Sequence, residues 1–229
     1  MTTKLWNKSE CRLWTVNLFL GTCTLYASRV ALPICATAVA HEYSWNKSDS
    51  ITDFSQIRNQ FHQYRPIFVI VSVIIRVRRK GPSRLEGTVL SCFFWGYAFT
   101  QLFAGVIADR FSGERILRVT TLLWALLTFF TPQLFDLAYS THSPLFFVII
   151  VRIFIGIGQG FHLPSTASIT SRHLTASDKG RVFGVCIAGS HLGTVVAGAV
   201  GSLLLDAFGW RSLFQFVGLI SLFMVDCIS

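Results

Sequence analysis

The stretch GVIADRFSGERIL, residues 105–117, places a dense group of charged side chains between two long apolar segments. The charged residues in it and just after it are Asp109, Arg110, Glu114, Arg115 and Arg118. Apolar runs of 18 or more residues recur along the chain, and each is long enough to cross about 30 Å of hydrocarbon. Because lipid offers no hydrogen-bond partner to an open backbone, each run is predicted to be a helix. The pattern therefore predicts an all-α membrane protein with this loop at one membrane surface.

Six membrane-spanning helices are predicted from the apolar runs. Their ranges are residues 13–39, 87–108, 116–137, 144–169, 182–205 and 212–227. The composition agrees, because 52% of the 229 residues are hydrophobic and 14% are charged, whereas a soluble domain has about a quarter charged residues. A soluble globular protein is thereby excluded.

The distribution of lysine and arginine predicts the orientation in the membrane. Basic residues occur before the first run, between the second and third runs, and between the fourth and fifth runs. The connecting segments DLAYSTHS and DAFGW contain none. The N-terminus and the loop at residues 109–115 are therefore expected on the cytoplasmic side.

A basic segment, residues 51–86, interrupts this regular pattern. It has seven basic and two acidic residues, and so supplies +5 of the net charge of +9. Its apolar patch, PIFVIVSVIIRV, is too short for an ordinary span, although a re-entrant or interfacial segment is an alternative. We expect residues 1–50 to hold the N-terminus and helix 1, residues 51–86 to be an insertion outside the fold, and residues 87–229 to hold helices 2 to 6. The positive charge then does not indicate a nucleic-acid partner.

Two arginines, Arg29 and Arg152, fall inside predicted spans. An arginine at the centre of a spanning helix costs about 2.5–3.5 kcal/mol on insertion scales, and is normally paired or functional. Counting residues from the span ends places both at about 12–15 Å below the outer surface. No carboxylate lies within one helical turn of either. The pair is predicted to bind an anion, with bonds to backbone carbonyls or snorkelling as the alternatives.

Small residues at helical spacing predict close packing between helices. Gly156 and Gly160 lie four residues apart near Gln159, whose amide is expected either to bond a substrate or to bond between helices. Gly189, Gly193 and Gly201 form a similar line with Ala197 between them.

No motif for enzymatic chemistry or metal binding is found. The sequence has no H-E-x-x-H, no P-loop, no G-x-S-x-G and no C-x-x-C. Neither an enzyme nor a bound cofactor or metal is expected.

The stretch GVIADRFSGER resembles the cytoplasmic loop signature of the major facilitator superfamily. Gly105, Asp109, Arg110, Gly113 and Arg115 occupy the positions of that signature. The resemblance implies that the aspartate and arginines fasten the cytoplasmic helix ends when the inner gate is shut. It also implies a fold of about twelve spans, of which this chain would be the N-terminal six-helix half, with an atypical insertion between helices 1 and 2.

Further segments resemble the organic anion transporter family of that superfamily, which includes sialin and the vesicular glutamate and nucleotide carriers. The segments are SCFFWGYAFTQLFAG, VRIFIGIGQGFHLPS and GSLLLDAFGWRSLFQFVG, while GTCTLYASRVALPIC and GERIL are most similar to the nucleotide-carrying members. The family's functional arginines correspond to Arg29 and Arg152. Its glutamate carriers have a histidine where Leu90 stands and an acidic residue where Gln159 stands.

This resemblance implies a secondary active transporter of organic anions, with nucleotides such as ATP as the expected substrate. Membrane potential or a proton gradient would drive it, with a proton or chloride as the coupling ion. The expected location is a secretory vesicle or lysosomal membrane, and the missing C-terminal six-helix half is the expected partner. The alternatives are another anion (sialate, glutamate or phosphate) or a truncated half-protein that does not transport.

Overall fold

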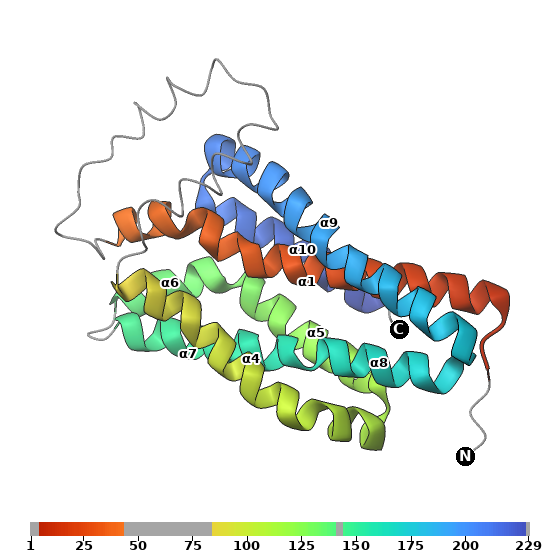
Figure 1. Cartoon of the computed structure of the whole chain (residues 1–229). Coiled ribbons are helices and arrows are strands. Elements are labelled where there is room, and N and C mark those ends of the chain that lie inside the picture. The colour runs from red at the N-terminus through yellow and green to blue at the C-terminus, as the bar shows by residue number, and fades with distance from the viewer. Residues whose placement is uncertain (1–4, 44–83, 141–143, 228–229) are drawn as a thin grey trace.

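The protein is a bundle of helices in the residues that the computed structural model describes, which are 5–43, 84–140 and 144–227 (Figure 1). The helices are α1 (Lys8–Glu42), α4 (Arg84–Phe111), α5 (Gly113–Phe129), α6 (Thr131–Ser140), α7 (Pro144–Gly160), α8 (His162–His173), α9 (Ala176–Phe208) and α10 (Trp210–Cys227).

Each predicted apolar run coincides with a helix or a pair of helices, but two runs are broken. The third run is divided into α5 and α6, which meet at an angle of 55°. The fourth is divided into α7 and α8 at Phe161. By length and hydropathy, four segments of the described chain are long enough to cross a membrane, and a fifth is added if α5 and α6 count as one. Trp210–Val225 is a shorter apolar helix, so six spans remain a prediction.

The predicted insertion, residues 51–86, lies mostly outside the described residues. Only its last three residues are described, and they belong to α4, which begins at Arg84. The expected boundary at residue 87 therefore falls inside a helix rather than before one.

The helices form two groups that pack against each other. In Figure 1, α1, α9 and α10 lie together, and α4, α7 and α8 lie together on the other side of α5. The most extensive helix pairs are α1 with α9 and α4 with α7, while α5 packs against α10. The interior polar residues described below lie between α1 and the α5–α7–α8 group.

Glycines allow α1 and α9 to pack backbone against backbone. A Cβ on Gly189 would lie 2.7 Å from the carbonyl oxygen of Phe19, and a Cβ on Gly193 would overlap the carbonyl of Cys23. Further along α9, a Cβ on Gly201 would lie 3.2 Å from Cδ1 of Ile34. The glycine line therefore sets how closely α9 approaches α1.

The same kind of contact joins α7 to α4. A Cβ on Gly156 would overlap the carbonyl oxygen of Phe93, and one on Gly160 would lie 2.9 Å from Cβ of Thr100. Since real Cβ atoms do not approach other atoms so closely, a larger residue at either glycine would push the two helices apart.

We expect Gly193→Val to destabilise the protein strongly, because its side chain would meet the backbone of α1. Forcing extra volume into packed contacts typically costs about 1–3 kcal/mol, and backbone cannot give way as a side chain can. The matched control is Gly198→Val on the same helix, where a Cβ would meet nothing within 4 Å. The thermal midpoint in detergent should fall for the first variant and stay near the original value for the second; equal midpoints would contradict a close α1–α9 contact.

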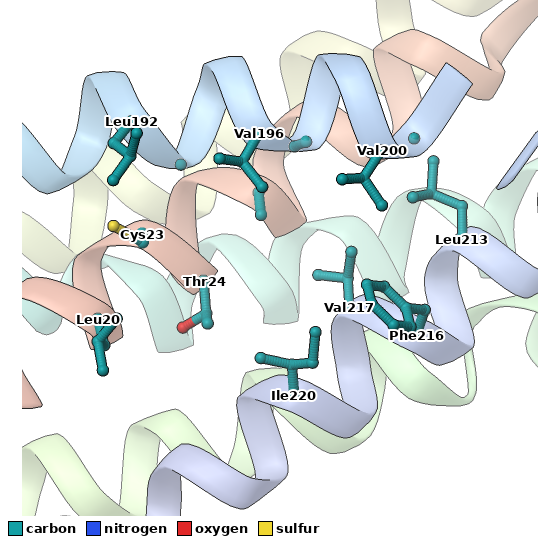
Figure 2. A pocket seen from close by; sticks show the side chains of 14 residues that line it. Leu20, Cys23, Thr24, Leu192, Val196, Val200, Leu213, Phe216, Val217 and Ile220 are labelled. Atoms are coloured by element: carbon teal, nitrogen blue, oxygen red, sulfur yellow. The ribbon is translucent and has the colours of Figure 1, made fainter. Parts of the chain in front are cut away.

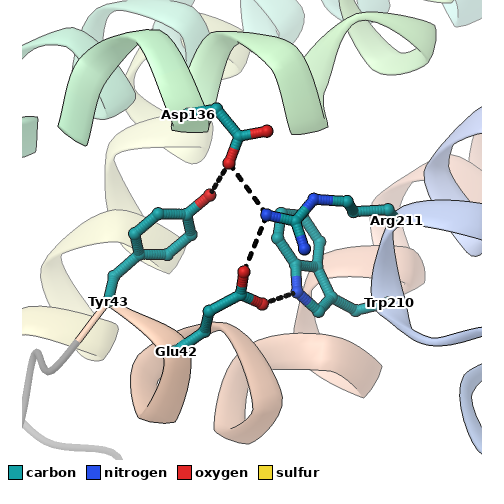
Figure 3. Close-up of polar contacts among 5 residues, drawn as sticks. All are labelled: Glu42, Tyr43, Asp136, Trp210 and Arg211. Atoms are coloured by element: carbon teal, nitrogen blue, oxygen red, sulfur yellow. Dashed lines mark hydrogen bonds and ion pairs between the residues drawn. The ribbon is translucent and has the colours of Figure 1, made fainter. Parts of the chain in front are cut away.

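A cluster of polar side chains joins α1, α6 and α10 at the end of the bundle far from the N-terminus (Figure 3). Nη2 of Arg211 lies 2.7 Å from Oε1 of Glu42 and 2.9 Å from Oδ1 of Asp136. The hydroxyl of Tyr43 donates to Asp136 at 2.6 Å, and Nε1 of Trp210 donates to Glu42. One arginine thus connects carboxylates from two different helices.

The stability of this cluster is expected to depend on pH through Glu42. Partial burial raises the pKa of Glu42, but the hydrogen bonds from Trp210 and Arg211 outweigh it and hold the pKa below its usual 4.5. A carboxyl with a lowered pKa stabilises the folded state above its unfolded pKa, and the stabilisation is lost as pH falls through the folded value.

We therefore expect the thermal midpoint to fall as pH is lowered below about 4.5, by an amount that corresponds to about 1 kcal/mol or less because these side chains are partly exposed. The decrease should be smaller in Glu42→Gln. An identical pH profile in that variant would show that Glu42 makes no net contribution.

Candidate functional site

A line of polar side chains runs through the apolar interior and connects α1, α5 and α7. Nε of Arg29 donates to Oε1 of Gln159 at 2.8 Å. Nε2 of Gln159 in turn donates to Oγ of Ser28 at 3.3 Å, and that hydroxyl lies 3.0 Å from Oγ1 of Thr128. Gln159 is only 1% exposed. Its amide therefore serves as the central group of a buried network and fixes the side chain of Arg29.

Aromatic rings surround the guanidinium of Arg29. Its Cζ lies 4.4 Å from the ring centroid of Tyr97, 4.7 Å from that of Tyr26 and 5.5 Å from that of Phe93. These distances suit cation–π attraction. Among the described residues, no carboxylate forms an ion pair with Arg29. Rings and an amide hold the side chain in place but leave its full positive charge uncompensated.

Arg152 on α7 is the most deeply buried cation in the described part of the chain, with 4% of its surface exposed. Its Cζ lies 5.9 Å from the ring centroid of Phe214, and it interacts electrostatically with the thiols of Cys35 and Cys92. Nε and Nη2 are buried, and neither has a hydrogen-bond partner within the described residues. A buried donor without a partner loses the free energy of its hydration. These two N–H groups of Arg152 are therefore unsatisfied within the described chain.

The structure separates the two arginines, which the sequence places at one depth. Arg29 bonds Gln159, seven residues beyond Arg152 on α7, which is a rise of roughly 10 Å. Arg152 in turn interacts electrostatically with Cys35, six residues beyond Arg29 on α1. The two helices run in opposite directions, and side chains lean toward the N-terminus of their own helix. The guanidinium groups consequently lean apart and lie one above the other along the bundle.

A buried histidine, His162, extends the polar line toward the N-terminal end of the bundle. It is 2% exposed at the start of α8, and its Nε2 lies 3.1 Å from Oγ1 of Thr22. That hydroxyl donates to the carbonyl of Leu18 at 2.8 Å, so the ring must donate to it through Nε2. Nδ1 is buried without a partner in the described chain. The structure thus satisfies one of the two ring nitrogens of His162.

The charged loop at residues 109–115 contacts α8 of the same bundle. Oδ1 of Asp109 accepts a hydrogen bond from Oγ of Ser168 at 2.6 Å, and its carbonyl accepts one from Arg172. Gly113 begins α5 against the same helix, where an added Cβ would lie 2.8 Å from the carbonyl oxygen of Ser165. Asp109 and Gly113 thus attach the loop to α8.

The other signature residues are less closely packed than Asp109 and Gly113. Arg110 and Arg115 are exposed, and a Cβ on Gly105 would meet nothing within 4 Å. Glu114, which lies outside the signature positions, is 3.5 Å from Nε2 of His173 at the end of α8. The exposed arginines are therefore available to a partner on the same membrane surface.

Sequence reasoning missed the residues that surround the predicted site. They are Ser28, Thr128, Thr22 and the rings of Tyr26, Tyr97 and Phe93. The spacing of Tyr26 and Arg29, one helical turn apart, was a usable signal for a ring beside the cation. No group of three or more metal-binding side chains is found in the described ranges.

Comparison with known proteins identifies the family. A family model for the Major Facilitator Superfamily matches residues 18–228. The voltage-gated purine nucleotide uniporter SLC17A9 of Rattus norvegicus is 35% identical over 222 residues, covering 97% of this chain and 41% of the relative. The same protein of Homo sapiens is 34% identical, covering 96% and 42%. Probable anion transporter 4, chloroplastic, of Oryza sativa is 36% identical over 132 residues, covering 58% and 21%. The chain spans about two fifths of the length of the first two relatives.

Proposed function

This chain belongs to the Major Facilitator Superfamily, and on that premise we propose that it supplies the N-terminal half of an organic anion transporter with purine nucleotides as substrates. The similarity to two purine nucleotide uniporters and to a probable anion transporter supports the substrate class. The observation that carries the proposal is Arg152, a buried guanidinium with two N–H groups that have no partner in the described chain.

The geometry suits a polyanion that extends along the bundle. A guanidinium binds phosphate or carboxylate oxygens through paired hydrogen bonds. Arg152 would bind one end of the anion, and Arg29, fixed by Gln159 and its rings, would bind a group roughly 10 Å away along α7. A triphosphate has charged groups spread over such a length, whereas a single carboxylate would engage one arginine at a time. The spacing of the two cations therefore favours nucleotides over small monoanions.

Transport would follow from alternating access between this half and a second six-helix half. The loop at residues 109–115 would fasten the cytoplasmic side through its exposed arginines, while Asp109 keeps it attached to α8. Moving one elementary charge across 100 mV corresponds to about 2.3 kcal/mol, so membrane potential alone would drive strong accumulation of a multivalent anion. A proton or chloride would be the coupling ion where a gradient contributes. A vesicle or lysosomal membrane, with the N-terminus in the cytoplasm, is the proposed location.

The proposal is tested by reconstituting two proteins in liposomes: this chain alone, and a chimera of residues 1–229 with the remaining C-terminal part of the rat relative. We expect the chimera to accumulate labelled ATP when the interior is made positive, with unlabelled nucleotides competing better than glutamate, sialate or phosphate. The chain alone should bind ATP without accumulating it. Competition by glutamate or sialate in place of nucleotides would overturn the substrate class, and an inactive chimera beside an active rat control would contradict transport.

A further inference from the structure

A cavity of about 420 Å³ lies at the N-terminal end of the α1–α9 pair. Arg12 of α1 and Arg181 of α9 line it together with Asp178. Both arginines are exposed, and within the described residues neither takes part in a hydrogen bond or ion pair. Its inner wall includes Val16 and Val185, which are exposed and apolar. The cavity thus combines two available cations and one carboxylate with an apolar wall.

A second cavity, of about 230 Å³, lies further along the same pair of helices, where α10 joins them (Figure 2). Leu20, Leu192, Val196, Phe216 and Ile220 line it, and all five are substantially exposed. Figure 2 shows their side chains projecting into the space between α1, α9 and α10, with the hydroxyl of Thr24 as a polar group beside them. The second cavity is therefore almost entirely apolar.

The two cavities lie in succession along one face of α1, and we refer to them together as the groove. On α1 the lining residues Arg12, Val16, Leu20, Thr24 and Ala27 are spaced by four, four, four and three residues, so they follow one face of the helix. From Val16 to Ala27 the rise is about 16 Å. That length matches half of a hydrocarbon core about 30 Å thick. The apolar part of the groove is therefore long enough for an acyl chain that extends to the middle of a bilayer.

We propose that this groove binds one phospholipid whose head group carries both a phosphate and an ammonium, from the leaflet on the N-terminal side. Arg12 and Arg181 hold the phosphate, for which paired guanidinium groups are well suited. Asp178 accepts a hydrogen bond from the ammonium. One of its oxygens already accepts the hydroxyl of Thr175 at 2.6 Å, and the other is the proposed acceptor for the ammonium. An acyl chain fills the apolar part of the groove.

The presence of Asp178 decides the class of head group. A purely anionic head group such as phosphatidylglycerol carries the same phosphate but no cation, so nothing in it would offset the repulsion between the phosphate and this carboxylate. A quaternary ammonium has no N–H to donate to it. A primary ammonium, as in phosphatidylethanolamine, satisfies all three charged side chains at once. The apolar groove in turn requires a lipid rather than a free phosphate compound.

Native mass spectrometry of the purified chain tests this, with added phosphatidylethanolamine, phosphatidylcholine or phosphatidylglycerol. We expect phosphatidylethanolamine to be retained several-fold better than the other two. Each basic residue near a membrane surface contributes about fivefold in affinity, so Arg12→Gln with Arg181→Gln should lower retention by about 25-fold. Arg115→Gln removes an exposed arginine that lines neither cavity; it is the matched control and should leave lipid retention unchanged.

Two further variants test the contributions of the head group and of the acyl chain to lipid binding separately. Asp178→Asn should remove the preference for phosphatidylethanolamine and raise the retention of phosphatidylglycerol. Val196→Trp, which fills the groove, should weaken all three lipids, and soluble phosphoethanolamine should not displace bound lipid. Equal or better retention of phosphatidylglycerol by the unmodified chain would overturn the proposal. So would unchanged retention in the double arginine variant or in Val196→Trp, since all three positions are exposed and substitution there leaves the fold intact.

Discussion

Arg152→Met is expected to raise the free energy of unfolding of the protein while abolishing its response to nucleotides. Nε and Nη2 of Arg152 are buried without partners in the described chain, and methionine fills a similar volume without a charge. Replacing buried charges by apolar side chains of similar volume is often neutral or stabilising by 1–4 kcal/mol. Unfolding of the purified chain in detergent, with and without ATP, measures both effects.

The different responses of the unmodified chain and of Arg152→Met to ATP make this prediction specific. A ligand at 100 times its dissociation constant stabilises a protein by about 2.7 kcal/mol, so ATP should raise the thermal midpoint of the unmodified chain. The midpoint of Arg152→Met should start higher and should not move. Uptake of ATP by the chimera should fall at least about 30-fold, because truncating one partner of a buried charge pair costs 2–5 kcal/mol or more.

Arg211→Met is the matched control, because Arg211 has the partners that Arg152 lacks. Its guanidinium lies within 3 Å of carboxylate oxygens of Glu42 and Asp136. The substitution should lower stability slightly, by about 1 kcal/mol or less at this partly exposed position, and should leave the ATP-induced shift in place. If Arg152→Met were instead the destabilising variant, partners within the protein would satisfy Arg152, and its role in anion binding would be lost.

The positions of the helices could be predicted from the sequence because burial in lipid requires long apolar runs. The breaks could not. Pro132 and Pro164 each lack the N–H that a continuous helix would donate to the residue four positions earlier, and the chain breaks near both, at Phe130 and Phe161. Yet Pro33 lies inside the unbroken α1. Proline alone therefore does not decide where a spanning helix breaks.

The same limit applies to the site. Composition and spacing were enough to select Arg29, Arg152 and Gln159, because charges and amides are rare in apolar helices. Their neighbours depend on which helices pack together and on the direction in which each side chain leans. The sequence gives neither, so the hydrogen bond from Arg29 to Gln159 and the vertical separation of the arginines emerged only from the structure.

Gln159→Glu is expected to inactivate the chimera at least as strongly as the loss of Arg152. Oε1 of Gln159 lies 2.8 Å from Nε of Arg29, so a carboxylate in its place would form an ion pair in surroundings of low dielectric constant. That pair would neutralise Arg29 and repel an incoming phosphate. We expect uptake of ATP to fall at least about 30-fold, while the thermal midpoint without ligand stays the same or rises.

Gln159→Leu distinguishes the effect of neutralising Arg29 from the effect of losing the Gln159 amide. Leucine removes the hydrogen bond, but the rings of Tyr26 and Tyr97 still hold the guanidinium, and its charge remains available to the anion. Uptake should therefore fall by less than about tenfold, which corresponds to the 0.5–1.5 kcal/mol of a typical hydrogen bond. Equal losses in both variants would assign the effect to the amide network with Ser28 and Thr128. Normal uptake in Gln159→Glu would exclude Arg29 from nucleotide binding in this protein, because the new carboxylate would lie at hydrogen-bond distance from its guanidinium.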